Sequence, residues 1–248
     1  MLEKVNLKLK LAKKDYEKAL PDLQRRLYDL EKACWDSRIA SLILFEGWDA
    51  SGKGSAISAL TSRLDPRGFK LHSIQPPRTF ESKRPWMWRF WLRTPNYGEM
   101  AIFDRSWYRR VLDDRVDGEV SAAQLEEAFR DINEFERGLA DDGVAIVKFW
   151  LHISRKEQRE RFEAIAKDPL ESWRVTKEDW ARHNKYKKYL EAAEEMLERT
   201  ETESGPWTIV EATSRWFARR KIFDAIIGTL ERRLGDKAPA AQPAKRRQ

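Results

Sequence analysis

The stretch from Gly47 to Gly54, with the sequence GWDASGKG, constrains the fold of this 248-residue chain more than any other part. It follows an apolar run, residues 42–45, and precedes a segment, residues 56–64, that can form a helix. Glycines let backbone N–H groups turn towards phosphate oxygens, a helix start adds positive potential, and a lysine reaches the transferred phosphate. This order therefore predicts a phosphate-binding loop. Its expected phosphate contacts are Gly47, Ala50, Ser51, Gly52, Lys53, Gly54 and Ser55.

The loop departs from the usual pattern at Gly54, where most such loops carry a Ser or Thr whose hydroxyl binds Mg²⁺. Ser55 comes one residue late and points elsewhere on a helix. A magnesium site then needs another oxygen ligand, and Asp49 within the loop is the candidate. The alternative is a strand-to-helix turn whose glycines serve only tight packing, and the flanking strand and helix favour phosphate binding over it.

A second group of polar residues follows another apolar run, residues 99–103, which we predict to be a buried strand. This run ends in Asp104-Arg105-Ser106-Trp107-Tyr108-Arg109-Arg110. A carboxylate at the carboxyl end of a neighbouring strand is where such a fold places its second magnesium partner. Arg105 and Arg110 are suited to neutralise charge on phosphoryl oxygens. We predict that Asp49 and Asp104 are metal ligands and that Lys53 and Arg105 complete the catalytic set. Without the glycine loop, an ordinary strand-end Asp with a salt-bridged surface would be the better interpretation of residues 104–110.

Strand-like and helical segments alternate along the chain. Strands are expected at residues 41–45, 69–74, 100–103, 144–153 and 207–210, with helices between them. This alternation predicts an α/β fold, a three-layer α/β/α arrangement around a parallel five-stranded sheet. Helix starts are indicated by capping-box pairs, namely Ser121 with Gln124, Ser154 with Glu157 and Thr176 with Asp179.

The chain divides into three predicted parts. Residues 1–36 form an N-terminal helical extension, with a helix expected over residues 15–33. Residues 37–234 form the phosphate-binding domain, with a helical lid at about 155–188. Residues 235–248 are expected to be a disordered basic tail. The lid is rich in Arg and Lys, and Arg155, Arg159 and Arg161 lie close together in it but cannot all share one helix face.

Charge and cysteine content restrict the class of partner and the compartment. The net charge of +7 indicates a polyanionic partner, a description that polyphosphate, a nucleotide or a nucleic acid would satisfy. The single cysteine, Cys34, excludes an internal disulfide and is typical of a reducing compartment, so we expect a cytoplasmic protein. No apolar run is long enough for a membrane helix. The histidines, His72, His152 and His183, show no metal-ligand spacing.

Several motifs together resemble the polyphosphate kinase 2 family. They are residues 45–54 (FEGWDASGKG), 64–68 (LDPRG), 103–108 (FDRSWY) and 168–170 (DPL) followed by Trp173. The similarity runs from about Asp15 to Leu234. Residues 88–91 (WRFW), 110–112 (RVL) and 148–154 (KFWLHIS) are most similar to the polyphosphate:AMP phosphotransferase branch.

The resemblance implies Mg²⁺-dependent phosphoryl exchange between inorganic polyphosphate and a nucleoside mono- or diphosphate, with AMP favoured and ADP open. It implies no nucleic-acid or membrane partner. It also places Asp49, Lys53, Asp104 and Arg105 at the family's functional core. Arg161 matches the Arg-Phe position of the family's lid, so the resemblance makes Arg161 the expected phosphate ligand there. The long N-terminal helix makes self-association into a homo-oligomer an expectation. The chain departs from the family in the lid, at Ile165, Ala166 and Glu171, where fewer cations and an added carboxylate weaken attraction for a polyanion.

Two other functions remain open from the sequence. One is an ATP-dependent kinase acting on a different small acceptor, which would share the loop and carboxylates but leave the Arg-Ser-Trp-Tyr run unexplained. The other is a catalytically impaired relative that binds polyanions, as the net charge and the altered lid suggest; the presence of all four core residues argues against it.

Overall fold

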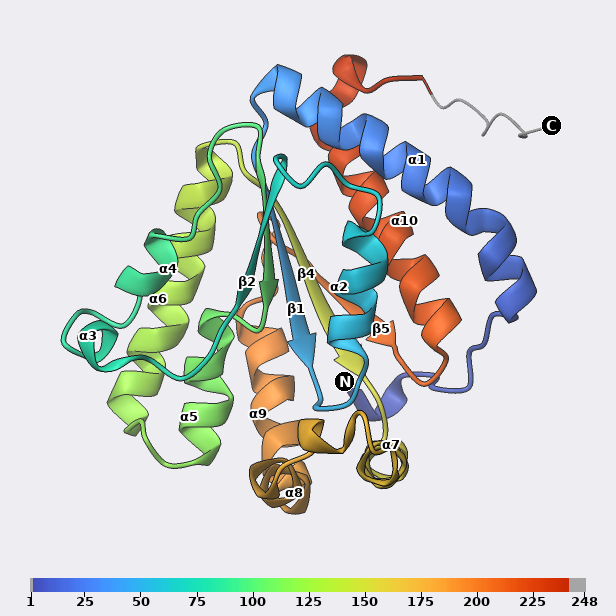
Figure 1. The fold of residues 1–248 in the computed structure, drawn as a ribbon. Helices are drawn as coiled ribbons and strands as arrows, with labels where there is room; N and C mark the ends of the chain where they lie inside the picture. The colour runs from blue at the N-terminus through green and yellow to red at the C-terminus, as the bar shows by residue number, and fades with distance from the viewer. Residues whose placement is uncertain (1, 241–248) are drawn as a thin grey trace.

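The computed structural model describes residues 2–240 and has a five-stranded parallel sheet at its centre (Figure 1). The strands are β1 (Ser41–Gly47), β2 (Phe69–Ser73), β3 (Met100–Asp104), β4 (Ala145–His152) and β5 (Trp207–Glu211), in the spatial order β2-β3-β1-β4-β5. All four strand pairings are parallel. The predicted α/β fold with its parallel sheet is confirmed.

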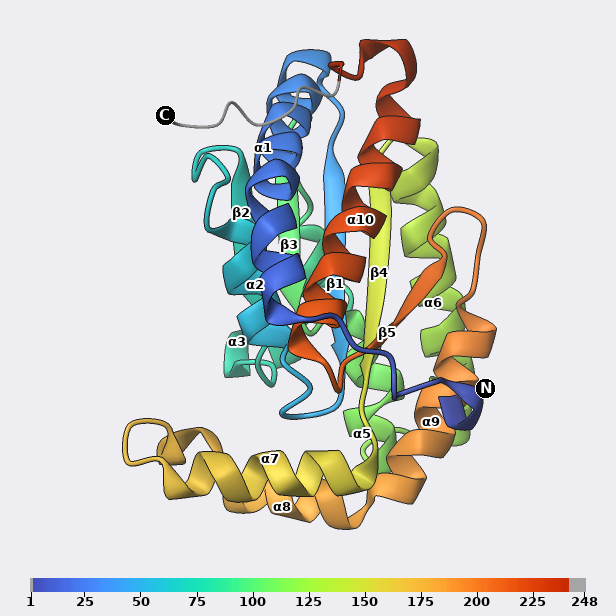
Figure 2. The same ribbon diagram turned by 90° about the vertical axis from the view of Figure 1, so that its right-hand side faces the viewer.

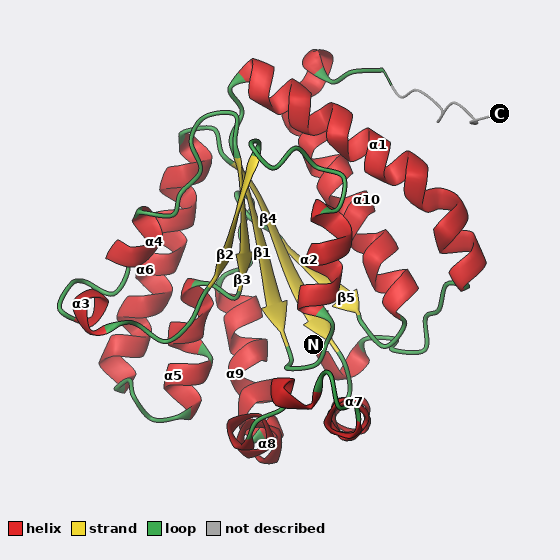
Figure 3. Cartoon of the chain, viewed as in Figure 1, coloured by secondary structure: helices red, strands yellow, loops and turns green. Residues whose placement is uncertain are grey.

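Helices cover both faces of the sheet and give three layers (Figures 1 and 3). Helices α1, α2 and α10 lie on one face, and α4 and α6 lie on the other. The α-helices are α1 (Lys13–Ser37), α2 (Lys53–Thr61), α3 (Thr79–Ser82), α4 (Trp88–Trp91), α5 (Asp113–Val116), α6 (Ala122–Asp141), α7 (Arg155–Lys167), α8 (Lys177–Asn184), α9 (Tyr186–Arg199) and α10 (Arg215–Leu234). Short 3-10 helices are η1 (Leu2–Lys4), η2 (Trp107–Val111), η3 (Ser172–Arg174) and η4 (Gly235–Lys237).

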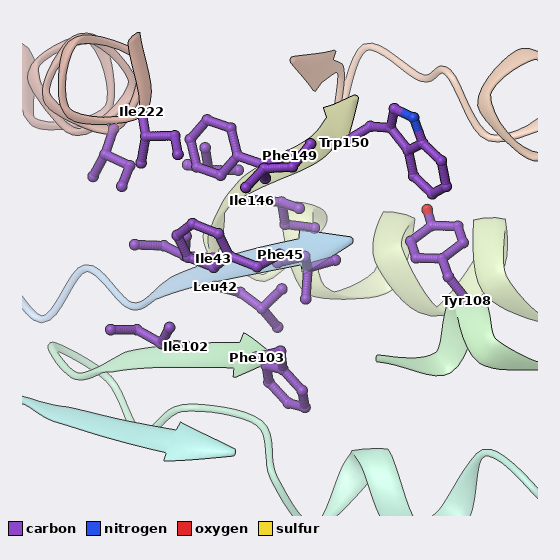
Figure 4. Close-up of a cluster of buried hydrophobic side chains, with 14 of the residues drawn as sticks. Leu42, Ile43, Phe45, Ile102, Phe103, Tyr108, Ile146, Phe149, Trp150 and Ile222 are labelled. Carbon is purple, nitrogen blue, oxygen red and sulfur yellow. The ribbon is translucent and has the colours of Figure 1, made fainter. Parts of the chain in front are cut away.

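The core lies around the three central strands, whose side chains are buried on both faces of the sheet (Figure 4). Parallel strands covered by helices on both faces need continuous apolar runs, and β1 and β4 supply them. Strand β1 is central, between β3 and β4, and its end therefore meets theirs at one edge of the sheet. This edge carries Gly47, Asp104 and His152, and ligand sites of such sheets lie there.

The N-terminal helix is longer than predicted and belongs to the core. Helix α1 extends to Ser37 and packs against α10, and its Leu27 and Leu30 are buried with the strand residues. The predicted boundary between residues 36 and 37 falls at the end of this helix, and we keep the division as a proposal. In the predicted tail, residues 235–237 form η4, while residues 241–248 lie outside the described residues.

The predicted lid is a helical excursion between β4 and β5. Helices α7 and α8 lie side by side across the carboxyl edge of the sheet, and α9 leads the chain back towards β5 (Figure 2). Two of the three expected capping boxes are complete, at Ser121 and Thr176. At Ser154 the hydroxyl accepts a hydrogen bond from the N–H of Glu157, which is half of the predicted arrangement.

A buried carboxyl group in α1 makes the stability of the protein depend on pH. Burial raises the pKa of Glu31 to about 7, although a hydrogen bond from the N–H of Asp65 opposes the shift. The folded state therefore holds a proton that the unfolded chain releases from about pH 4.5 upwards. The stability contributed by this group is complete below that pH and is lost as the pH rises to 7.

We therefore expect Glu31→Gln to gain stability relative to the wild type as the pH is raised. The gain in Tm of the variant over the wild type is expected to be larger at pH 8 than at pH 5, measured by thermal unfolding at both values. Glu17→Gln, at an exposed position of the same helix, is the control. A difference between Glu31→Gln and wild type that does not change with pH would contradict the assignment.

Candidate functional site

The glycine loop has a backbone that only glycine permits at its first position. Gly47 has φ of +131°, and a Cβ there would lie 2.7 Å from the Leu151 nitrogen and still closer to the Leu151 oxygen. Gly52 has φ of +98° and is the N-cap of α2, which begins at Lys53. The loop thus turns directly into a helix N-terminus, as the sequence predicted. Backbone N–H groups at such a terminus favour an anion.

Lys53 is buried beneath the loop. Its ammonium donates hydrogen bonds to the carbonyl oxygens of Gly47 (2.8 Å) and Trp48 (2.9 Å). Burial lowers the pKa of Lys53, and Arg105 lowers it further, whereas the carboxylates of Asp49 and Asp104 oppose the shift. The loop therefore holds its lysine in place by its own carbonyl groups, close to both predicted carboxylates.

Asp49 is held between two arginines. Its carboxylate accepts a hydrogen bond from Arg105 and another from Arg182 Nε at 2.7 Å. Burial alone would raise the pKa of Asp49, but Arg105, Lys53 and Arg182 outweigh it and hold the pKa below its usual range. Asp49 is therefore ionised at neutral pH and paired with residues that come from two distant segments.

Asp104 differs from Asp49 in having a free carboxylate. It ends β3 and is the register partner of Phe45 in β1, which puts it beside the glycine loop. Among residues 2–240 its carboxylate makes no hydrogen bond or ion pair, although its charge raises the pKa of Lys53 and of Arg105. An unpaired carboxylate facing cations at this edge is available to a cation or to water.

The two predicted carboxylates fit a magnesium ion. Mg²⁺ prefers oxygen ligands and commonly takes one or two carboxylates together with substrate phosphates and water. Asp104 has a carboxylate that no described residue occupies. The carboxylate of Asp49 is bonded to Arg105 and Arg182, so it could bind a metal only after these arginines exchanged it for another anion. Within the described residues no group of three His, Cys, Asp or Glu side chains could hold a metal alone. A metal at this edge would therefore be completed by its substrates.

Arg105 is placed by a strained backbone and by two further carboxylates. Its φ is +63°, a left-handed conformation that non-glycine residues rarely adopt. Its guanidinium approaches Asp113 at 3.6 Å as well as Asp49. The next residue, Ser106, donates a hydrogen bond of 2.7 Å to the buried carboxyl group of Glu46, whose pKa burial raises to about 7. Sequence reasoning missed both Glu46 and Asp113.

The lid contacts the loop through two residues of α7. Arg161 donates to the Ala50 oxygen (2.9 Å) and to the Ala212 oxygen (2.8 Å), so the predicted lid arginine does reach the glycine loop. The Gln158 amide donates to the backbone carbonyl oxygen of Asp49 at 3.2 Å. The other end of this amide is hydrogen-bonded to His183 of α8, with Oε1 2.8 Å from Nδ1. Arg155 and Arg159 make no contact with the loop in the described structure. Gln158 and Arg182 carried no signal in the sequence.

The remaining predicted phosphate ligands lie in different settings. Ala50 has φ of +57°. The hydroxyl of Ser51 is buried without a hydrogen-bond partner in the described structure. The exposed hydroxyl of Ser55 donates back to the Gly52 oxygen at 2.9 Å. Arg110 lies 3.7 Å from Asp114 and does not line the cavity at the loop.

Trp48 of the glycine loop is held by ring contacts with α9 and β4. Trp48 stacks on Tyr186 of α9 with ring centres 4.0 Å apart, and its indole N–H donates to His152 Nδ1 at 3.0 Å. Burial lowers the pKa of His152 to about 4, so the ring is neutral and its proton sits on Nε2. His152 is therefore a buried hydrogen-bond partner that helps to hold Trp48 in place.

The space enclosed by these groups is small. The cavity measures about 40 Å³ and is lined by Glu46, Gly47, Trp48, Asp49, Arg105, Leu112, Asp113, Trp150, Gln158, Arg182 and Tyr189. Sites for small molecules usually enclose several hundred Å³. A cavity of this size has no room for a molecule as large as a nucleotide.

Comparisons with known proteins agree with this geometry. Residues 10–238 match the family model described as "Polyphosphate kinase 2 (PPK2)". A protein of Pseudomonas syringae pv. tomato named polyphosphate:AMP phosphotransferase is 40% identical over 94% of this chain and 47% of its own length. An ADP-polyphosphate phosphotransferase of Pseudomonas aeruginosa is 35% identical over 96% of this chain and 78% of its own length.

A solved structure has the same fold. The crystal structure of polyphosphate kinase 2 from Arthrobacter aurescens TC1 superposes with a TM-score of 0.91 at 30% identity, covering 98% of this chain and 88% of that one. The chain spans about half the length of the polyphosphate:AMP phosphotransferases that it matches. No described helix is long and apolar enough to cross a membrane.

Proposed function

Because the chain belongs to the polyphosphate kinase 2 family, we propose that it transfers a phosphoryl group between inorganic polyphosphate and a nucleotide. The observation that carries this proposal is the convergence of the glycine loop with Lys53, the free carboxylate of Asp104 and Arg105 at one edge of the sheet. AMP is the favoured acceptor, because relatives with 37–40% identity are named polyphosphate:AMP phosphotransferases. ADP remains the alternative, since an ADP-polyphosphate phosphotransferase is 35% identical.

In the proposed reaction a phosphate oxygen of the nucleotide attacks a phosphorus atom of the polyphosphate chain in line with the leaving oxygen. Such an oxygen is already a competent nucleophile, so the protein needs no strong base, and its contribution is positioning and electrostatics. The loop N–H groups and Lys53 hold the transferred phosphate. Arg105 balances the charge that spreads over its oxygens, and Arg161 completes this set from the lid.

Asp49 and Asp104 would hold Mg²⁺, which supplies charge neutralisation for the phosphate oxygens. Entry of phosphate gives Arg105 and Arg182 a new anion to bind, so both can turn from Asp49 to the substrate and leave that carboxylate for the metal. The lid helices then exclude water, which would otherwise hydrolyse the activated phosphate.

Transfer from long-chain polyphosphate to AMP and, separately, to ADP, with Mg²⁺ and without added ATP, tests the proposed function. We expect ADP to form from AMP. Formation of ATP from ADP alone would keep the polyphosphate donor and change the acceptor. Transfer from ATP but not from polyphosphate would replace the proposal with an ATP-dependent kinase. Binding of polyphosphate without any transfer would leave a polyanion-binding relative.

We further propose that the protein works in the cytoplasm as a homo-oligomer. The single cysteine, which is buried in α1, is typical of a reducing compartment. Size-exclusion chromatography with light scattering measures the oligomeric state directly, and a monomer at micromolar concentration would contradict this part of the proposal.

A further inference from the structure

Two aromatic residues shortly after Arg105 do not line the cavity, yet they are among the most buried residues of the described structure. Trp107 and Tyr108 begin η2, both are fully buried, and neither lines the cavity. A generic phosphate-binding fold needs no such residues after its strand-end Asp-Arg pair. Their polar atoms show what they do.

Both side chains donate hydrogen bonds to one carboxylate in α6. Glu136 Oε1 accepts from Trp107 Nε1 at 3.0 Å and from the Tyr108 hydroxyl at 2.6 Å. Glu136 is itself buried, and its position in α6 is fixed by the surrounding apolar side chains of that helix. Glu136 therefore orients Trp107 and Tyr108, while Glu46 accepts the hydrogen bond from Ser106, the residue just before them.

A buried lysine in β4 completes this network. Lys148 Nζ donates to Glu136 Oε2 at 2.8 Å, to the Tyr108 hydroxyl at 3.0 Å and to the Thr200 oxygen at 2.8 Å. It also lies 4.8 Å from the ring centre of Trp207. All three protons of the ammonium group are therefore used, in a place with no exposed surface.

The network connects the segment that carries Arg105 to the chain on both sides of the lid. Strand β4, which carries Lys148, runs directly into the lid, and Thr200 follows α9, by which the chain returns from it. Tyr108 lies three residues from Arg105. Through one ammonium and one carboxylate, the segment that carries Arg105 is thus connected to the strand that leads into the lid and to the end of the helix by which the chain returns from it.

We propose that Glu136 and Lys148 are positioning residues that keep Arg105 in a fixed position relative to the lid during phosphoryl transfer. Stability alone does not require the pair, because apolar side chains of similar volume often replace a buried ion pair without loss, whereas removal of one partner alone is costly. What apolar side chains cannot do is direct the Trp107 N–H and the Tyr108 O–H. This inference rests on the proposed function for its kinetic test, and a second test is independent of activity.

The kinetic test compares Glu136→Gln, Lys148→Met and the double variant Glu136→Leu/Lys148→Met in the polyphosphate-to-nucleotide assay. Lys148→Met is expected to lose most in Tm, and the double variant is expected to recover much of that loss. The kcat of the double variant should stay about ten- to a hundredfold below the wild type, as for other small misplacements of catalytic groups, with KM for the nucleotide little changed. Glu136→Gln keeps an oxygen for Trp107 and Tyr108 and should retain the highest kcat of the three.

If kcat rises with Tm in the double variant to the wild-type value, the pair is merely structural and the proposal is wrong. Should the double variant fail to fold, Lys148→Met decides, assayed well below its own Tm: a kcat equal to that of the wild type would overturn the proposal, whereas a kcat lowered about tenfold or more, with KM for the nucleotide unchanged, supports it.

The second test measures amide hydrogen exchange in peptides that cover residues 103–112 and the start of α1. In Lys148→Met and in the double variant, loss of protection in the first peptide alone supports the positioning role, and unchanged protection there contradicts it. Because exchange needs no turnover, this result stands even if the wild-type protein transfers no phosphate, in which case only the proposed function fails.

Discussion

Replacing Asp104 with Asn is expected to lower kcat by about 10³-fold, the size of effect seen when a group that stabilises transition-state charge is removed. The carboxylate makes no hydrogen bond or ion pair among residues 2–240, so the amide gives up no contact of the folded protein. What the variant loses is a negative charge beside Lys53 and Arg105 and an oxygen that can hold Mg²⁺. Function should therefore fail while the fold remains.

The measurement is the rate of polyphosphate-dependent nucleotide phosphorylation together with Tm for the same preparation. Asp224→Asn provides the matched control, because Asp224 is an exposed partner of Arg220 on α10, away from the cavity. The control should keep wild-type turnover and Tm. Turnover near the wild-type rate in Asp104→Asn would remove this residue from the mechanism.

Gly47→Ala is expected to lower the free energy of unfolding by roughly 3–5 kcal/mol, at the upper end of single-residue effects. The added methyl group would press on the backbone of Leu151, which cannot rotate away as a flexible side chain would, and the φ of +131° is unfavourable for alanine. Either β1 and β4 separate at this point or the loop changes its path.

Chemical denaturation of Gly47→Ala and Gly54→Ala measures this effect against a matched exchange in the same loop. A Cβ at Gly54 would meet nothing within 4 Å, and this residue lies in α2, where alanine is favourable. Gly54→Ala should therefore be as stable as the wild type or more so. Equal stability of the two variants would show that the backbone at residue 47 relaxes freely.

Much of the fold could be predicted from the sequence because its signals are local. Strands β1, β3 and β4 are short, mainly apolar runs between helical segments, and the glycines and lysine of the loop mark a turn that leads into a helix. Lys53 and Arg161 both donate hydrogen bonds to the glycine loop, and their binding of phosphate stays a prediction. The short helices α3, α4 and α5 were not foreseen, because four residues give no periodic pattern to recognise.

The rest of the site could not be predicted because it depends on contacts between distant segments. Arg182 and Asp49 are separated by 133 residues, and only the folding of α8 over the loop brings them together. Arg110 was expected to face phosphate from its neighbourhood in sequence, but the turn of η2 directs it towards Asp114. The carboxylates that place Arg105 likewise became visible only with the packing of β1 and α5.

The order of strands in the sheet decides when a nascent chain can first gain stability from its substrates. Neither spatial neighbour of β1 is the strand that follows it in sequence; one is β3 and the other is β4, which ends at His152. Gly47 packs directly on Leu151, so the glycine loop lacks this contact until β4, roughly 100 residues further along the chain, has joined the sheet. Before that point the proposed substrates have no complete site to occupy. In a cell, this part of the protein must reach its fold by apolar burial alone, and ligands add stability only to chains that have already closed the sheet.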